Sequence, residues 1–157
     1  TSFASYELHL LKVDVLSRIF GTILALIAIV GGVYAFHLKD VGQQSSALVY
    51  AGGALGVTFA GDYFTLFIFW EMMAAASSYL IWARRTTSSD NAGMRYLLVH
   101  IFGGGLLFSG ILLHLYEGGS LLITSLTESY SPAKVLMLLG VAFNAAIPPL
   151  HAWLADA

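Results

Sequence analysis

The sequence predicts an all-α membrane protein, a polytopic bundle of about five transmembrane helices. Hydrophobic residues make up 58% of the 157 positions and charged residues only 10%, whereas soluble domains carry about 25% charged residues. The chain also contains several apolar runs of the length that a helix needs to cross a bilayer, about 20 residues. Because so little charge cannot cover a water-facing surface, we expect the lipid bilayer to surround this protein.

The same composition excludes several classes of protein. Cysteine is absent, which excludes a disulfide framework and a thiolate metal site. A net charge of −2 without a long basic run argues against nucleic-acid binding. The five histidines are scattered, at positions 9, 37, 100, 114 and 151. We therefore expect no catalytic residue, metal site or cofactor in this chain.

Five spans are expected to form a single transmembrane domain: residues 16–36, 47–61, 63–83, 93–116 and 133–148. The mixed, partly charged residues before the first span are expected to form an interfacial turn or a short helix. The second span is only 15 residues long, or about 22 Å as a helix. Its Gly52 and Gly56 form a pattern of small residues that favours close contact between helices.

The third span is the most informative, because Glu71 lies near its middle. An ionised carboxylate at that depth costs several kcal/mol unless it is paired, solvated or protonated. Its neighbours one and two turns along the helix are Ala74, Ala75 and Ser78, whose small side chains leave space for water or a partner helix. We therefore predict an ion or proton site at Glu71. A snorkelling or structurally hydrogen-bonded glutamate is the alternative.

The fourth span follows the third after the short polar stretch Arg84–Asn91, so the two helices are expected to pack antiparallel. Counting back from that connection places Glu71 opposite roughly position 105. His100 then lies about 7–8 Å from Glu71 in depth, a distance that one or two waters bridge, and histidine can both accept and donate a proton. A neutral histidine that is hydrogen-bonded between helices is the alternative.

The fifth span ends in a pair of prolines, Pro148 and Pro149. Since proline lacks an N–H group, the carbonyls of Asn144 and Ala145 lose their helical partners. Irregular backbone at membrane depth is tolerated where it is buried in protein or lines a watered cavity, and broken helices mark binding sites in transporters. We predict a hydrated break here, with a simple packing kink as the alternative.

Three stretches of the sequence resemble a known family. The runs GDYFTLFIFWEMMAAASSYLIW, RYLLVHIFGGGLL and NAAIPPLHAWLADA are similar to the proton-translocating antiporter-like membrane subunits. This family includes the D-type subunit of Mrp Na⁺/H⁺ antiporters, the large antiporter-like subunits of respiratory complex I, and relatives in membrane-bound hydrogenases. The resemblance covers about residues 45–157.

The resemblance implies that this chain is a fragment of a larger subunit, roughly its third to seventh helices. Glu71 matches the family's glutamate on the fifth helix, Arg95 lies near a position that is often basic, and His151 matches the histidine of the PLHxWLxDA motif. The sequence departs from the family at Asn144, where a lysine that couples to the glutamate is usual, and at Ala155, where proline is common.

These observations predict a membrane subunit of a multisubunit Na⁺/proton antiporter that moves protons through Glu71, His100 and water. Its expected partners are the lipid bilayer, other membrane subunits, protons and Na⁺, in the inner membrane of a prokaryote. One alternative is an antiporter-like proton-pumping subunit of a respiratory NADH:quinone oxidoreductase or a membrane-bound hydrogenase, whose catalysis lies in other chains. The other is a non-conducting scaffold. The basic Arg84–Arg85 pair favours a cytoplasmic location for the Arg84–Asn91 stretch.

Overall fold

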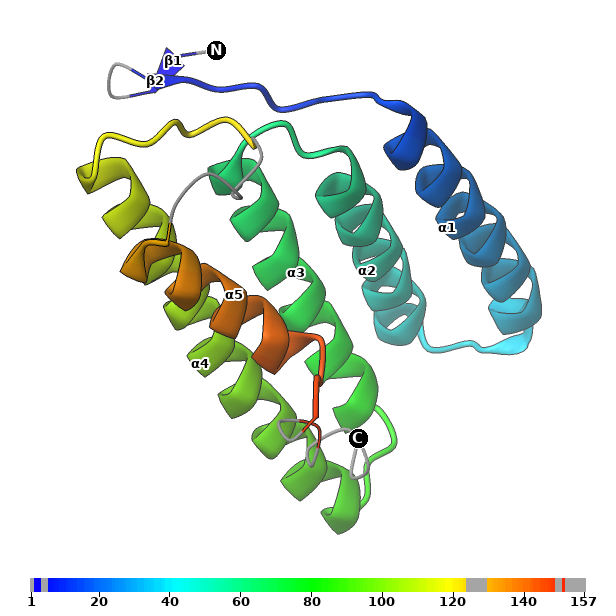
Figure 1. The fold of residues 1–157 in the computed structure, drawn as a ribbon. Coiled ribbons are helices and arrows are strands. Elements are labelled where there is room, and N and C mark those ends of the chain that lie inside the picture. Colours follow the sequence, from blue (N-terminus) through cyan, green and yellow to red (C-terminus); the bar gives the residue numbers. More distant parts are fainter. Residues whose placement is uncertain (1, 4–5, 124–129, 149–150, 152–157) are drawn as a thin grey trace.

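A computed structural model describes residues 2–3, 6–123, 130–148 and 151 of the chain. Its architecture is a bundle of five α-helices with short connections between them (Figure 1). The helices are α1 Val15–Tyr34, which continues into a 3₁₀ turn over Ala35–His37, α2 Val41–Phe59, α3 Tyr63–Trp82, α4 Thr87–Tyr116 and α5 Pro132–Asn144.

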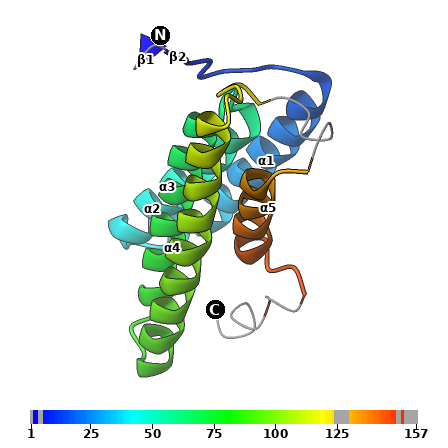
Figure 2. The same cartoon turned by 60° about the vertical axis from the view of Figure 1, so that its left-hand side comes forward.

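Helices α1 to α4 stand in a row, each against its neighbour in sequence, and α5 lies in front of this row (Figure 1). Helices α1, α2 and α3 follow one another, α4 packs beside α3, and α5 lies against the half of α4 farther from the α3–α4 loop (Figures 1 and 2). Three of the described helices are long and apolar enough to cross a membrane: α1 with its 3₁₀ turn, α3 and α4. The predicted fold class is therefore confirmed, whereas membrane crossing by α2 and by the shorter α5 stays a prediction.

Helix α4 begins at Thr87, six residues before the expected start of the fourth span. Thr86 and Ser89 form a capping box: the Ser89 N–H donates to Thr86 Oγ1 at 3.1 Å, and the Thr86 N–H donates to Ser89 Oγ at 3.0 Å. Such reciprocal bonds satisfy N–H groups that have no partner within the helix. Most of the polar Arg84–Asn91 stretch is therefore the first turn of a helix and not a loop.

Helix α2 likewise begins earlier than its apolar run, at Val41. The Asp40 carboxylate caps it by accepting hydrogen bonds from the backbone N–H groups of Gly42 at 2.9 Å and Gln43 at 3.3 Å. These bonds, that of Gln43 above all, hold the pKa of Asp40 below its ordinary value. The cap therefore stabilises the helix fully when the pH is above the ordinary pKa of an aspartate. This stabilisation is lost as the pH falls through the lowered pKa of Asp40. Arg85 Nη2 lies 3.6 Å from Asp40 Oδ2 and links the α1–α2 and α3–α4 loops.

Helix α5 ends at Asn144, four residues before the expected boundary at Pro148. The N–H groups of Ala146 and Ile147 donate back to carbonyls in the last turn of α5, at 3.3 and 3.0 Å, which is the pattern of a Schellman cap. Ala146 adopts a positive φ of 52° in this cap, a position that is usually glycine. The helix ends early because the residue before a proline disfavours helical backbone, and the cap completes the turn.

The described part of the N-terminal segment, residues 2–3 and 6–14, is extended and contains no helix. Strands β1 (Ser2–Phe3) and β2 (Tyr6–Glu7) pair as a short antiparallel hairpin. The chain then runs over the ends of the helices (Figure 1), where the Lys12 N–H donates to the Phe59 carbonyl at 2.8 Å and Lys12 Nζ donates to the Ile123 carbonyl at 3.3 Å. One backbone bond to the end of α2 and one side-chain bond to the loop after α4 therefore hold this segment against the bundle.

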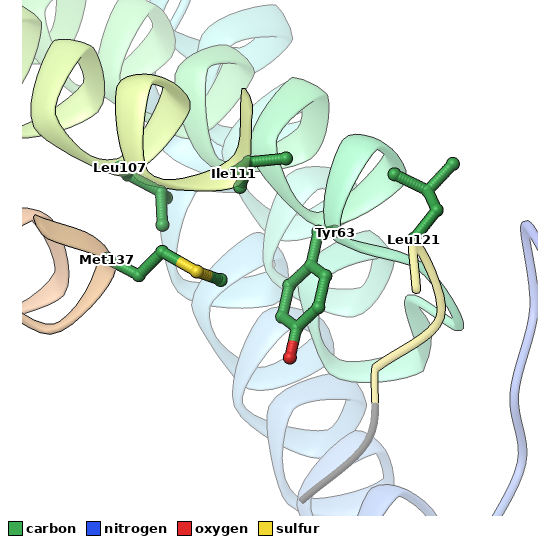
Figure 3. Close-up of a cluster of buried hydrophobic side chains, with 5 residues drawn as sticks. All are labelled: Tyr63, Leu107, Ile111, Leu121 and Met137. Atoms are coloured by element: carbon green, nitrogen blue, oxygen red, sulfur yellow. The ribbon is translucent and has the colours of Figure 1, made fainter. Parts of the chain in front are cut away.

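The apolar core lies between α3, α4 and α5, near the α4–α5 connection. Figure 3 shows its members, Leu107, Ile111 and Met137 with Tyr63 and Leu121 beside them. The Tyr63 N–H donates to the Leu121 carbonyl at 3.0 Å. This bond ties the beginning of α3 to the loop after α4, so the core fixes the three helices that carry the candidate site.

Labelling of single cysteines tests the arrangement of α4 across the membrane. Ser88 is exposed in the first turn of α4, and Tyr130, 90% exposed, precedes α5. We expect Ser88→Cys to react with a membrane-impermeant maleimide from the cytoplasmic face and Tyr130→Cys from the opposite face, because α4 crosses between them. Labelling of both from the same face in the full-length protein would contradict a membrane-spanning α4.

Candidate functional site

The register of α3 against α4 places Glu71 opposite Gly104. Phe67 stacks on Phe108 with 4.9 Å between ring centroids, and one turn further along α3 the Glu71 carboxylate lies against Gly104. The expected opposite position was 105, so counting from the connection is correct to within one residue. The expected register is correct although α4 begins six residues early, because these added residues lie beyond the end of α3.

Gly104 makes the space that the Glu71 carboxylate occupies. A Cβ atom at this position would overlap Glu71 Oε1. That oxygen is buried and accepts no hydrogen bond from any described residue. On the same face of α3, Ala74 and Ser78 are buried, whereas Ala75 is exposed. The carboxylate therefore points into the bundle, which argues against a snorkelling glutamate.

Asn144 approaches the same turn of α4 from the other side. It is 9% exposed, and neither Oδ1 nor Nδ2 of its amide has a hydrogen-bond partner among the described residues. A Cβ atom at Gly103 would overlap Asn144 Oδ1. The Glu71 carboxylate and the Asn144 amide therefore contact two consecutive residues of α4, Gly104 and Gly103.

A close approach of α4 and α5 positions Asn144. A Cβ at Gly110 would come within 2.7 Å of the Met137 backbone nitrogen, and one at Gly140 within 2.5 Å of the Leu107 backbone nitrogen. Glycine pairs of this kind let two helix backbones approach closely. This close packing of α4 and α5 places the last turn of α5 against Gly103.

His100 lies one helical turn from Gly104, on the same face of α4, and is 6% exposed. Its Nδ1 lies 3.1 Å from the Tyr96 carbonyl, and the His100 and Tyr96 rings stack with 4.0 Å between centroids. Since a carbonyl only accepts, Nδ1 carries the hydrogen and neutral His100 has its lone pair on Nε2. The structural alternative of a hydrogen-bonded neutral histidine is compatible with this geometry, and the relay role stays a prediction.

A pair of hydroxyl groups lies on the side of His100 that is nearer the α3–α4 loop. Ser77 Oγ of α3 lies 2.6 Å from Tyr96 Oη of α4, and Ser77 Oγ also donates to the Met73 carbonyl at 2.7 Å. The sequence interpretation missed this pair. Its signal was the four-residue spacing of Tyr96 and His100, which places both on one helix face.

The other predicted site residues lie elsewhere. Arg95 is exposed on α4, His151 is exposed in a turn, and Pro148 is exposed beyond the cap of α5. Pro149 lies outside the described residues. The structure does not bring the three described residues to Glu71, so the place of all four in an ion path stays a prediction.

Asp62 is a fully buried carboxylate, with no exposed surface, whereas Glu71 is half-buried. It caps α3: the Thr65 N–H donates to Asp62 Oδ1 at 2.7 Å, and the Thr65 hydroxyl donates to Oδ2 at 3.0 Å. Both carboxylate oxygens of Asp62 thus have partners from the helix that it begins. This pairing distinguishes a structural acid from Glu71, whose Oε1 has no such partner within the described ranges.

The bundle, three of whose described helices are of membrane length, holds a half-buried carboxylate and a buried amide that have no hydrogen-bond partner in the described part of the chain. This combination defines an integral membrane protein with polar groups between its helices. Intramembrane acids of this kind mark ion and proton pathways. The chain belongs to the family described as NADH:quinone oxidoreductase/Mrp antiporter, whose transmembrane profile matches residues 60–157. The resemblance predicted from the sequence motifs is therefore confirmed.

Three relatives illustrate the range of the family. The chain is 33% identical over 121 residues to the A-type subunit of the Na⁺/H⁺ antiporter of Alkalihalophilus pseudofirmus, an alignment of 70% of this chain and 15% of the relative. It is 29% identical over 157 residues to hydrogenase-4 component B of Escherichia coli, covering 92% of this chain and 23% of the relative.

The third relative is NADH-quinone oxidoreductase subunit N 1 of Sorangium cellulosum, 31% identical over 153 residues, covering 87% of this chain and 30% of the relative. The chain thus spans less than a third of the length of each of these proteins.

Proposed function

We propose that the protein is a membrane subunit of a multisubunit Na⁺/proton antiporter in a prokaryotic inner membrane and that Glu71 carries the proton. The observation that supports this function best is a pair of buried polar groups without partners among the described residues, Oε1 of Glu71 and the amide of Asn144. They contact the consecutive residues Gly104 and Gly103 of α4. Unsatisfied buried polar atoms cost roughly 1–3 kcal/mol each, so a pair of such groups is best explained by water or an ion between them.

In this proposal Glu71 alternates between its neutral and its charged form. Asn144 does not titrate, so its amide orients water or a cation, with Nδ2 as donor and Oδ1 as acceptor. His100 exchanges protons with Glu71 over one helical turn, about 5.4 Å, through water. The break after Asn144 supplies backbone carbonyls for a hydrated gate, and the chain needs no cofactor of its own.

An antiporter-like subunit of a redox-driven proton pump is the second candidate. The names of two relatives, hydrogenase-4 component B and NADH-quinone oxidoreductase subunit N 1, favour it. The same path through Glu71 would then serve protons only, and electron transfer would take place in partner subunits. Both candidates place the protein in an assembly with other membrane subunits.

Reconstitution of the complete assembly into liposomes tests the choice between the candidates. With an imposed Na⁺ gradient and no electron donor, we expect a pH-sensitive dye inside the vesicles to report proton movement opposite to Na⁺, because antiport couples the two fluxes directly. A K⁺ gradient of equal size is the control for a nonspecific leak. Proton movement that begins only when an electron donor and a quinone are added would contradict the antiporter and support the redox-driven pump.

A further inference from the structure

Polar side chains line the α3–α4 interface on the loop side of Glu71. From Gly104, where the carboxylate lies, His100 is one turn and Tyr96 two turns closer to the α3–α4 loop, and Ser77 of α3 meets Tyr96 there. Eight residues of α4 separate Gly104 from Tyr96, or about 12 Å along the helix. The polar groups therefore cover about half the depth between the middle of the bundle and its loop end.

Either hydroxyl of the pair can donate to the other. Ser77 Oγ lies 2.7 Å from the Met73 carbonyl, 3.1 Å from the Ala74 carbonyl and 2.6 Å from Tyr96 Oη. When Ser77 donates to its own helix the phenol donates to Ser77, and when the serine hydroxyl rotates it donates to the phenol. A serine bond to the carbonyl four residues back satisfies the serine alone, so the phenol contact is an additional link between α3 and α4.

Stacking connects this link to the histidine. The Tyr96 and His100 rings are nearly parallel, 19° apart with centroids separated by 4.0 Å, and the Tyr96 carbonyl orients Nδ1 of His100. His100 therefore has a fixed ring plane and a fixed tautomer. Proton exchange at His100 then takes place at Nε2, because Nδ1–H is held by a carbonyl that cannot take the proton.

We propose that Ser77 and Tyr96 form a hydroxyl relay that carries protons between the α3–α4 loop side and His100. The inference rests on the proposed function, since the relay supplies the proton that Glu71 binds. In each transfer a proton adds to one hydroxyl oxygen while the hydrogen of that oxygen passes to the next acceptor. Between the Tyr96 hydroxyl and Nε2 of His100 this acceptor is water, because the two rings stack on each other. One O–H bond forms and one breaks at each group, both hydroxyls end neutral, and they rotate back before the next proton.

Variants without the hydroxyls test the relay in the full-length protein within its assembly. Tyr96→Phe keeps the ring that stacks on His100 and removes the hydroxyl, and Ser77→Ala removes the other. We expect each to lower the initial rate of proton movement per assembled complex by about 10²-fold, the low end of what a positioned proton-transfer group contributes. The double variant should be no slower than either single one, because groups that act in one series are not additive. The solvent deuterium isotope effect should change in all three.

The control is Tyr79→Phe, a tyrosine on the same helix as Ser77 whose hydroxyl is directed at Gly42 of α2; it should transport at the wild-type rate. Ser77→Thr, which retains a hydroxyl, should restore most of the rate lost in Ser77→Ala. A wild-type rate and isotope effect in Tyr96→Phe, while Glu71→Gln is inactive, would overturn the relay and leave the proposed function standing. Full activity of Glu71→Gln would instead overturn the proposed function.

Discussion

Glu71→Gln is expected to abolish proton movement in the full-length protein and to leave its assembly intact. Glutamine has the volume of glutamate and occupies the same space beside Gly104, but it cannot bind and release a proton. Its neutral amide is also less costly to bury than a carboxylate. The measurement is the initial rate of proton movement in proteoliposomes, divided by the amount of assembled complex.

Glu117→Gln is the matched control. Glu117 is exposed at the end of α4 and its Oε2 accepts a hydrogen bond from Ser131, so its neutralisation leaves the bundle centre unchanged and transport should persist. Undiminished transport in Glu71→Gln would eliminate the carrier role and support the non-conducting scaffold. Loss of assembly in Glu71→Gln would show a structural glutamate, the alternative to an ion site.

Gly104→Ala is expected to cause the second largest loss of transport. The added methyl group would occupy the position of Glu71 Oε1, so the carboxylate must move away from α4. A displacement of about 1 Å in a reacting group can lower a rate about 10²-fold. Alanine is favoured over glycine within a helix by roughly 0.5–1 kcal/mol, so we expect the loss of transport without a loss of thermal stability.

The neighbouring Gly105→Ala separates displacement of Glu71 from a general effect on α4. A Cβ atom at Gly105 meets no atom within 4 Å, so this variant should transport at the wild-type rate and should be slightly more stable. If Gly104→Ala and Gly105→Ala both transport at the wild-type rate, transport does not depend on the position of the Glu71 carboxylate beside Gly104.

The fold class and the register of the central helices could be predicted from the sequence because both follow from simple lengths. Apolar runs of membrane length predict helices, and the short connection between α3 and α4 places Glu71 within one residue of its observed opposite position. Helix ends could not be predicted this way. Hydropathy identifies apolar residues, whereas α2 and α4 begin where Asp40 and Thr86 cap them.

The candidate site was predicted only in part. Glu71 was conspicuous as an acid within an apolar span, and Asn144 through its place before the prolines. The Gly103–Gly104–Gly105 run gave no sign that its first two members face polar groups and its third does not, because that distinction depends on the rotation of α4 between α3 and α5. The partnership of Ser77 with Tyr96 depends on the same rotation.

The two consecutive glycines of α4 have a mechanical consequence. Consecutive residues project about 100° apart around a helix, so α3 and α5 reach this point of α4 from different directions. One peptide unit separates Gly104, which Glu71 contacts, from Gly103, which Asn144 contacts. A small turn or slide of α4 therefore changes the surroundings of both side chains together. Helix α4 is thus a contact surface shared by the two side chains, and its position sets the space that is open to each of them.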